Sequence, residues 1–297
     1  VLLLLNDGAH QFETLILLED VGRVVCAEAA DLDGDRDLDI AVCVFGDIDT
    51  GKVVWLEQTA PLVFEERTLD PRPGAIHAFP FDADDDGDLD IAVSLSQLSE
   101  EVLLFRNDGA GAFAKEVLFS AGDDNYGMSG IELSDLDQDG DTDILFTNGD
   151  TNDAGFPEGF DPYRFHGLSW LENDGSGRFT VHDIVRHWGA YSVRAFDADG
   201  DSDLDLVLSS VQDTLFFPNI VTQTMIWLEN DGAQSFTPHP LNKSLPPYVW
   251  SIEAVDLDGD GVTDVMGGSL DPAGGGLGHR LGMFQIPQRR WCRSPKD

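Results

Sequence analysis

The sequence is poor in basic residues, with 17 Lys and Arg against 56 Asp and Glu and a formal charge of -39. Nucleic-acid binding needs clustered Lys and Arg to neutralise phosphates, so we expect no nucleic-acid partner. Strongly acidic chains can be disordered, but 42% hydrophobic residues in regular β patterns argue against disorder here. The chain is therefore predicted to be folded and acidic.

Long apolar runs are also missing. The N-terminal run Val1–Leu5 is far shorter than the roughly 20 residues that a membrane-spanning helix takes, so we expect no membrane insertion. The run has no basic flank and no small-residue cleavage site, and it fits a signal peptide poorly.

Three Cys cannot build a disulfide framework. Cys26 and Cys43 flank the acidic stretch 31–39, and we expect two buried thiols, with a bridge as the alternative.

Two short sequence patterns alternate along the chain instead, and no stretch shows a sustained helical period. The first pattern is an apolar stretch, then Asn-Asp-Gly, then a Phe four residues after the Gly; it occurs at Asn6, Asn107, Asn173 and Asn230. A degenerate copy has Gln58 in place of the Asn. Asn, Asp and Gly tolerate positive φ, so the pattern predicts a β-hairpin.

The second pattern is a nine-residue acidic loop, found as DLDGDRDLD, DADDDGDLD, DLDQDGDTD, DADGDSDLD and DLDGDGVTD from residues 31, 82, 135, 197 and 256. The copies are separated by 51, 53, 62 and 59 positions, and a β-patterned run follows each. Four short strands per repeat at this period predict an all-β fold, a β-propeller of four-stranded antiparallel blades. A β-solenoid is the alternative, although its repeats are usually shorter.

We expect one propeller domain over residues 1–297, with an outer hairpin at 1–20, five repeats at 21–284 and an atypical tail at 285–297. The five acidic-loop repeats and the N-terminal half-repeat predict six blades, with a fragment of seven as the alternative. Glu28, Glu132, Arg194 and Glu253 share one register on the inner strands. They line the channel or, as we favour, form ion pairs between blades through Arg194.

So many carboxylates in one loop repel one another unless a cation neutralises them. Asp stands at positions 1, 3, 5 and 9 of every loop, and a backbone carbonyl is available at position 7. Such hard oxygen ligands suit Ca²⁺. An EF-hand would need Glu at position 12, where Val42, Val93, Phe146, Leu208 and Gly267 stand, so it is rejected. Solvated acidic turns without metal remain the simpler alternative.

The loops followed by apolar strands resemble the FG-GAP/VCBS repeat of integrin-α-like calcium-binding propellers, from Val1 to about Phe284. The resemblance implies about five structural Ca²⁺ ions, one in each acidic loop between the two innermost strands of a blade. It implies that the side-chain ligands are Asp31, Asp33, Asp35, Asp39, Asp82, Asp84, Asp86, Asp90, Asp135, Asp137, Asp139, Asp143, Asp197, Asp199, Asp201, Asp205, Asp256, Asp258, Asp260 and Asp264, with the carbonyls of Asp37, Asp88, Asp141, Asp203 and Val262. Arg36 and Ser202 stand where Gly is usual at position 6.

A second site is expected on the opposite face, which carries the long insertions Thr147–Gly167 and Ser209–Gln223. Faces with long loops and aromatic rings are where propellers usually bind ligands. The candidate ligand-binding residues are Tyr163, His166, Trp188, Tyr191 and Trp250. Aromatic rings beside Asp and Asn suit a carbohydrate. Packing between blades is the competing interpretation for each ring.

Two functions follow. The favoured one is an extracellular or cell-surface Ca²⁺-stabilised module, possible also in the periplasm, that binds glycans or protein partners, including in adhesion. The alternative is a propeller enzyme of the polysaccharide lyase or dehydratase type. The sequence has no G-x-S-x-G, HExxH or P-loop motif, and no catalytic residue is assigned. Since Ca²⁺ is abundant outside cells, we expect an exported protein whose targeting segment is absent from this sequence.

Overall fold

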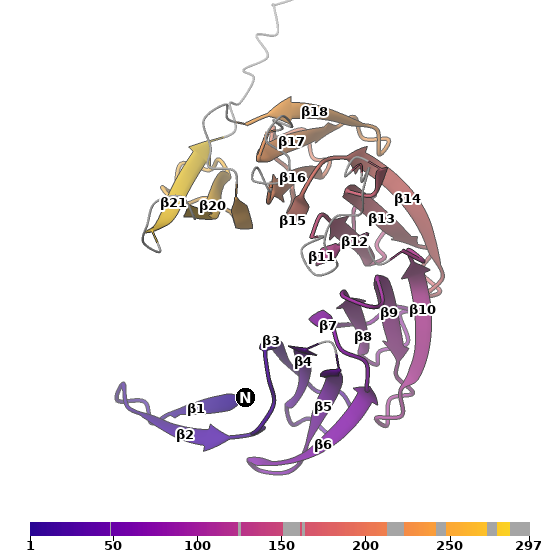
Figure 1. The fold of residues 1–297 in the computed structure, drawn as a ribbon, viewed down its shortest axis with the longest axis vertical. Coiled ribbons are helices and arrows are strands. Elements are labelled where there is room, and N and C mark those ends of the chain that lie inside the picture. Colours follow the sequence, from indigo (N-terminus) through magenta and orange to yellow (C-terminus); the bar gives the residue numbers. More distant parts are fainter. Residues whose placement is uncertain are drawn as a thin grey trace, which may run out of the picture.

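The computed structural model describes residues 1–47, 49–123, 126–150, 161, 164–212, 223–241, 248–271 and 278–285. Its regular elements are β-strands, which form six antiparallel sheets arranged along an arc (Figure 1). None of these residues belongs to a helix long and apolar enough to cross a membrane.

Four of the sheets have four strands each, and every strand pairs with its neighbour in sequence. They are β3 (Val24–Ala30), β4 (Asp39–Asp47), β5 (Thr50–Ala60) and β6 (Val63–Asp70); β7 (Ala75–Phe81), β8 (Asp90–Leu95), β9 (Glu101–Arg106) and β10 (Ala114–Ser120); β11 (Met128–Ser134), β12 (Asp143–Asn148), β13 (Gly167–Asn173) and β14 (Phe179–Arg186); and β15 (Ala190–Phe196), β16 (Asp205–Ser210), β17 (Met225–Asn230) and β18 (Phe236–Pro240). We call these sheets blades 1 to 4.

Two smaller sheets stand at the ends of the arc. One is the hairpin β1 (Leu2–Asn6) and β2 (Phe12–Ile16). The other, blade 5, holds β19 (Val249–Val255), β20 (Asp264–Asp271) and β21 (Gly278–Gln285). The first strand of each complete blade lies toward the inside of the arc and the fourth at its rim (Figure 1). This radial order of antiparallel sheets is a β-propeller, as the repeat predicts.

Packing between blades explains why the second and third strands are apolar on both faces. Cys43 and Trp55 of blade 1 share one buried cluster with Ile91 and Phe105 of blade 2. The whole of β8 is buried, because blades 1 and 3 cover its two faces. Burial of this kind is the main stabilising contribution to the fold.

The N-terminal hairpin is covered on one face only. Val1 packs against a cluster that includes Val42 and Val54 of blade 1. On the other face, Leu2 and Leu4 are 63% and 56% exposed. The hairpin therefore uses the apolar stretch of the repeat as a strand, as the sequence predicts for Val1–Leu5.

Cys26 and Cys43 form a disulfide across β3 and β4, with their Cα atoms 5.0 Å apart. The expectation of two thiols is corrected, because the β3–β4 register places the two residues directly opposite each other. A Cα separation of this size lies within the range that disulfides adopt.

Candidate metal sites and the long-loop face

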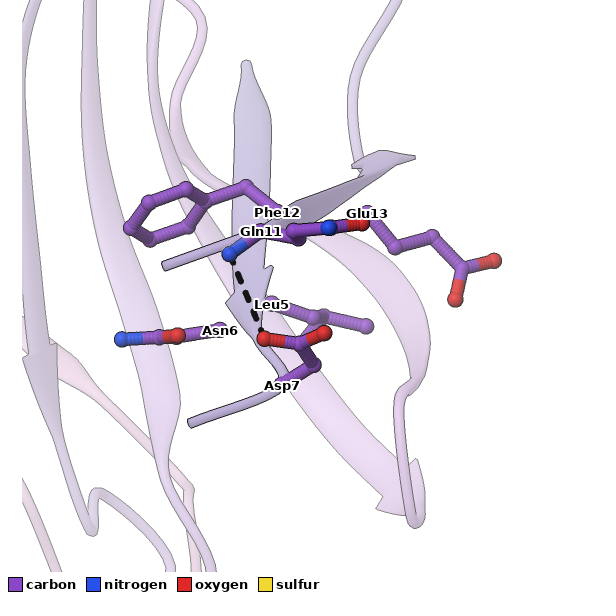
Figure 2. Close-up of a pocket in the computed structure, with 6 residues that line it drawn as sticks. All are labelled: Leu5, Asn6, Asp7, Gln11, Phe12 and Glu13. Carbon is purple, nitrogen blue, oxygen red and sulfur yellow. Dashed lines mark hydrogen bonds between the residues drawn. The ribbon is translucent and has the colours of Figure 1, made fainter. Parts of the chain in front are cut away.

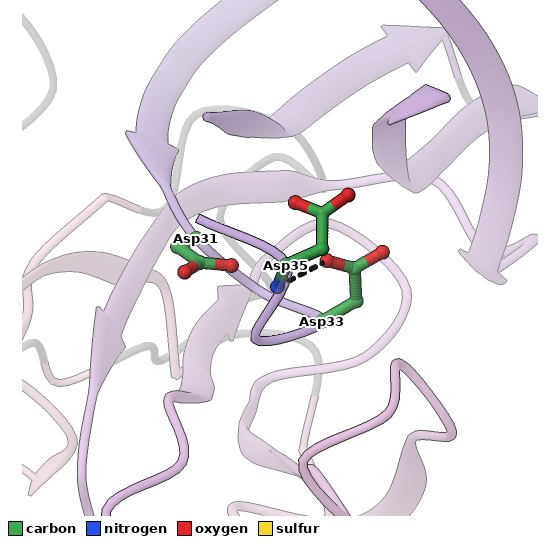
Figure 3. A group of neighbouring side chains, drawn as sticks. All are labelled: Asp31, Asp33 and Asp35. Atoms are coloured by element: carbon green, nitrogen blue, oxygen red, sulfur yellow. Dashed lines mark hydrogen bonds between the residues drawn. The ribbon is translucent and has the colours of Figure 1, made fainter. Parts of the chain in front are cut away.

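The acidic loops connect the first and second strands of blades 1 to 5, as expected for an inner hairpin. In every loop, three carboxylate oxygens lie within 4.8 Å of one another. The groups are Asp31, Asp33 and Asp35; Asp82, Asp84 and Asp86; Asp135, Asp137 and Asp143; Asp197, Asp199 and Asp201; and Asp256, Asp258 and Asp260. Figure 3 shows the first group gathered around the turn of its loop. The structure thus brings together most of the predicted side-chain ligands.

All five loops share one backbone shape. Positions 4 and 6 have positive φ in each loop, including the non-glycine residues Arg36 (77°) and Ser202 (81°). The N–H of Arg36 donates to Oδ2 of Asp31 at 3.0 Å, and that of Ser202 donates to Oδ2 of Asp197 at 3.2 Å. Gly87 makes the same bond to Asp82 at 2.9 Å. The loops without glycine at position 6 therefore keep the common shape despite the steric cost of a side chain.

The Asp at position 9 of each loop is buried, and its hydrogen bonds hold the loop against the blade. In blade 3, Oδ2 of Asp143 accepts the N–H of Leu136 at 3.0 Å, and Oδ1 accepts the N–H of Asn173 at 2.8 Å. Asp205 makes the equivalent pair of bonds in blade 4. Burial raises the pKa of Asp143 and of Asp205 to about 6. Each of these carboxylates shapes its loop, and in blade 3 Asp143 is also a member of the converging group.

Several loop oxygens are buried and have no hydrogen-bond partner among the described residues. They include Oδ1 of Asp135, Asp137 and Asp199. A buried polar atom without a partner is costly, and such atoms commonly face a missing ion or water. Converging carboxylates with unsatisfied oxygens fit a hard divalent cation, which prefers oxygen ligands. The residues present thus suit the metal that the sequence implies.

In three loops, a glutamate outside the predicted set of ligands acts electrostatically on the Asp at position 3. Burial raises the pKa of Asp33, Asp137 and Asp199, and the negative charges of Glu57, Glu172 and Glu229, respectively, add to this effect. The recurring Trp-Leu-Glu before the turn was the signal for these residues. Each of the three glutamates extends the negative field of its loop.

The described residues among those predicted for the opposite face divide into a buried pair and a half-buried pair. His166 and Trp188 are 1% and 2% exposed, so neither offers a surface to a ligand in this structure. Nδ1 of His166 accepts the N–H of Gly189 at 3.1 Å, and burial lowers the pKa of this histidine to about 3. Tyr163 lies outside the described residues. Tyr191 and Trp250 are half-buried.

Tyr191 and Trp250 occupy a special position in their strands. The pairing register of the first two strands of each blade skips one residue, which marks a β-bulge. The skipped residues are Val25, Ile76, Ser129, Tyr191 and Trp250. Bulges change the direction of a side chain and are frequent beside binding sites. The rings of Tyr191 and Trp250 meet edge to face at 5.0 Å, and Tyr248 stacks beside Trp250 at 6.5 Å.

Further along the same strands, Arg194 of β15 joins three blades. Its Nη1 lies 2.9 Å from Glu132 of β11, and its Nη2 lies 3.0 Å from Glu253 of β19. The predicted ion pairing between blades is therefore confirmed for these residues.

A separate pocket of about 330 Å³ lies at the turn of the N-terminal hairpin. Its lining residues are Leu5, Asn6, Asp7, Gln11, Phe12 and Glu13 (Figure 2). The N–H of Gln11 donates to Oδ1 of Asp7 at 3.2 Å across it. Phe12 is 58% exposed, so the pocket is an open turn surface.

Residues 82–146 match the family model described as FG-GAP-like repeat. The match spans the second and third acidic loops and confirms the resemblance there. No curated protein matches the sequence.

Among solved structures, one similar protein is a thermostable family-43 glycoside hydrolase, with 11% identity and a TM-score of 0.44, covering 75% of this chain and 78% of that one. Another is CoXyl43, a GH43 β-xylosidase/α-arabinofuranosidase from a compost microbial metagenome, in complex with xylotriose in a calcium-free form. It has 13% identity and a TM-score of 0.39, covering 90% of this chain and 92% of that one. At these values the likeness carries no conclusion about activity.

Proposed function

We propose that this protein is a calcium-stabilised propeller that binds a partner on its long-loop face. The observation that carries the calcium part is the shared geometry of the acidic loops, with converging carboxylates in each and buried unsatisfied oxygens in several. Calcium would be held by the Asp residues at positions 1, 3 and 5 of each loop, and the Asp at position 9, which converges with the group in blade 3, would fix the loop and complete the set of ligands. The ion would supply positive charge that offsets carboxylate repulsion, and so stabilise each inner hairpin.

Chelation tests this role. Each site stabilises the fold by about 2.7 kcal/mol when free Ca²⁺ is 100 times its Kd, so removal of the ions should lower the Tm strongly. Asp137→Asn should reduce the calcium-dependent gain in Tm, whereas Asp183→Asn, at an exposed pair with Arg186, should leave it unchanged. A Tm that is indifferent to chelator at low ionic strength would refute the structural role of calcium.

The proposed recognition site is the aromatic group Tyr191, Tyr248 and Trp250. Its support is the bulge position of Tyr191 and Trp250 and the partial exposure of all three rings. Rings of this kind stack on sugars or anchor protein partners, and the strong negative charge of the chain disfavours polyanions. A glycan array and a cell-surface protein panel, each probed with the wild type and with Trp250→Ala, test it. Binding that survives in the variant places recognition elsewhere.

Export is proposed with this function. Millimolar Ca²⁺ is an extracellular condition, and the Cys26–Cys43 disulfide suits an oxidising compartment. Calcium titration of the loops is the measurement. Dissociation constants in the nanomolar range at all loops would remove the argument from calcium supply.

A further inference from the structure

The complete blades differ at one position beside the acidic loop, the residue just before the Asn-Asp-Gly turn or, in blade 1, just before Gln58. Blades 1, 3 and 4 have Glu57, Glu172 and Glu229 there, whereas blade 2 has Arg106. The register of the second and third strands aligns these residues, because Ile40 pairs with Leu56, Ile91 with Phe105, Ile144 with Leu171 and Leu206 with Leu228. A charge of opposite sign therefore stands at an equivalent place in blade 2.

Arg106 reaches its own acidic loop. Its Nη1 lies 3.6 Å from Oδ2 of Asp84, the third residue of that loop. Two further contacts hold the guanidinium: Nε donates to Glu116 at 2.8 Å, and Nη2 donates to the carbonyl of Gly177 in the next blade. Both members of the Arg106–Asp84 pair are about one-quarter to one-third exposed, at 26% and 31%. The positive charge is thus fixed beside a predicted calcium ligand.

The order of charges is reversed in the other blades. Nε2 of His182 lies 2.6 Å from Glu172, and Nε2 of His239 lies 2.5 Å from Glu229, so the acid stands nearer the loop and the base behind it. In blade 1, Nε of Arg67 donates to Glu57 at 2.6 Å in the same order. Blade 2 has the base next to the loop and Glu116 behind it.

We propose that the acidic loops of the four complete blades are unequal calcium sites, and that Arg106 makes the loop of residues 82–90 the weakest of them. This inference rests on the calcium binding proposed above. A divalent ion held by Asp84 would lie close to the guanidinium and would be repelled by it, and even at the dielectric constant of water such repulsion corresponds to about a tenfold loss of affinity. Arg106 also competes with the ion for Asp84.

The loop of blade 2 also carries one additional carboxylate, Asp85 at position 4. Asp85 is exposed, so solvent and salt screen its charge more strongly than that of the partly buried Arg106.

Calcium titration by calorimetry on the full chain, with ion counting by native mass spectrometry, tests the proposal. Wild type should show one blade-loop site about tenfold weaker than the others, and Asp84→Asn should remove that weak site. Arg106→Glu should raise its affinity by about tenfold or more. The converse variant, Glu172→Arg, should create a second weak site. Arg186→Glu changes the net charge equally at an exposed position away from the loops and serves as the control.

Because Arg106 also contacts Gly177, Arg106→Gln is a second variant that retains a hydrogen-bond donor. It should raise the affinity of the weak site by less than Arg106→Glu does. The inference would be overturned, with the proposed function left standing, if calcium affinities changed no more in Arg106→Glu, Arg106→Gln and Glu172→Arg than in the Arg186→Glu control. A wild type that binds no calcium in a folded state would overturn the proposed function and this inference together.

Discussion

The side-chain amide of Asn173 donates to the carbonyl oxygen of Ala83, 90 positions earlier in the chain, at 2.9 Å. Ala83 lies in the acidic loop of blade 2 and Asn173 at the turn of blade 3, so the bond links a turn to the loop of the preceding blade. Asn107 makes the same contact with Leu32 at 2.7 Å. The two repeated sequence patterns therefore meet across the interface between blades.

Asn173→Ala should lower the free energy of unfolding by about 1–3 kcal/mol, because it leaves a buried carbonyl without its partner. Asn6→Ala is the matched control: Asn6 accepts the N–H of Gly8 as Asn173 accepts that of Gly175, but it is exposed. Chemical denaturation of both variants gives the comparison. Equal losses would show that the turn, and not the contact between blades, accounts for the effect.

Ser202→Gly should stabilise the protein by about 1 kcal/mol, because Ser202 holds a φ of 81° that is unfavourable for a residue with a Cβ. Gly87→Ser makes the opposite change at the equivalent position of blade 2, where φ is 93°. It should destabilise by a similar amount. Thermal unfolding in saturating calcium measures both, and a loss of stability in Ser202→Gly would contradict the prediction.

In the calcium-free protein, the buried carboxylates of the acidic loops should add stability as the pH falls from 7 toward 4. Burial raises the pKa of Asp90, Asp143 and Asp205 to about 6, above the value of 3.8 for a free carboxyl, so these groups bind protons more tightly in the folded state. His77, His166 and His187 act in the opposite direction, because burial lowers their pKa to about 4, 3 and 4. Asp143→Asn should therefore lower the stability of the calcium-free protein at pH 5 relative to pH 7, compared with the wild type.

The stabilisation by calcium should shrink as the pH falls, because protons compete with the ion for the carboxylates. Tm measured at pH 7 and pH 5, with calcium and with chelator, gives the calcium-dependent gain at each pH. High salt screens the general repulsion of the acidic chain and leaves the effect of the buried groups. Parallel pH profiles with and without calcium would contradict this prediction.

Trp188→Ala should cost about 3–5 kcal/mol of stability, as large-to-small changes at buried aromatic residues do. Trp250→Ala should cost less stability, because its ring is half-buried, and should instead weaken binding of the partner by about 2 kcal/mol or more. Unfolding and binding measured on the same two variants separate packing from recognition. An equal loss of stability in both would assign Trp250 to packing.

The sequence by itself determined the repeat, the antiparallel strands and the place of the acidic loops. These features depend on local chemistry: alternation along a strand, positive φ at Asn, Asp and Gly, and Asp at fixed spacing. The same local logic predicted that Arg194 pairs with glutamates in the equivalent register of neighbouring blades, and the structure confirms it for Glu132 and Glu253.

Only the tertiary structure decided which side chains the blades cover. His166 and Trp188 are of residue types that often line exposed binding sites, yet both are buried. The disulfide required a strand register that is exact to one residue, and a slip of one residue would turn Cys43 to the other face. The pairing of Arg106 with Asp84 depends on how the third strand lies beside the loop. The burial of His166 and Trp188 and the pairing of Arg106 depend on contacts that the repeated pattern does not specify.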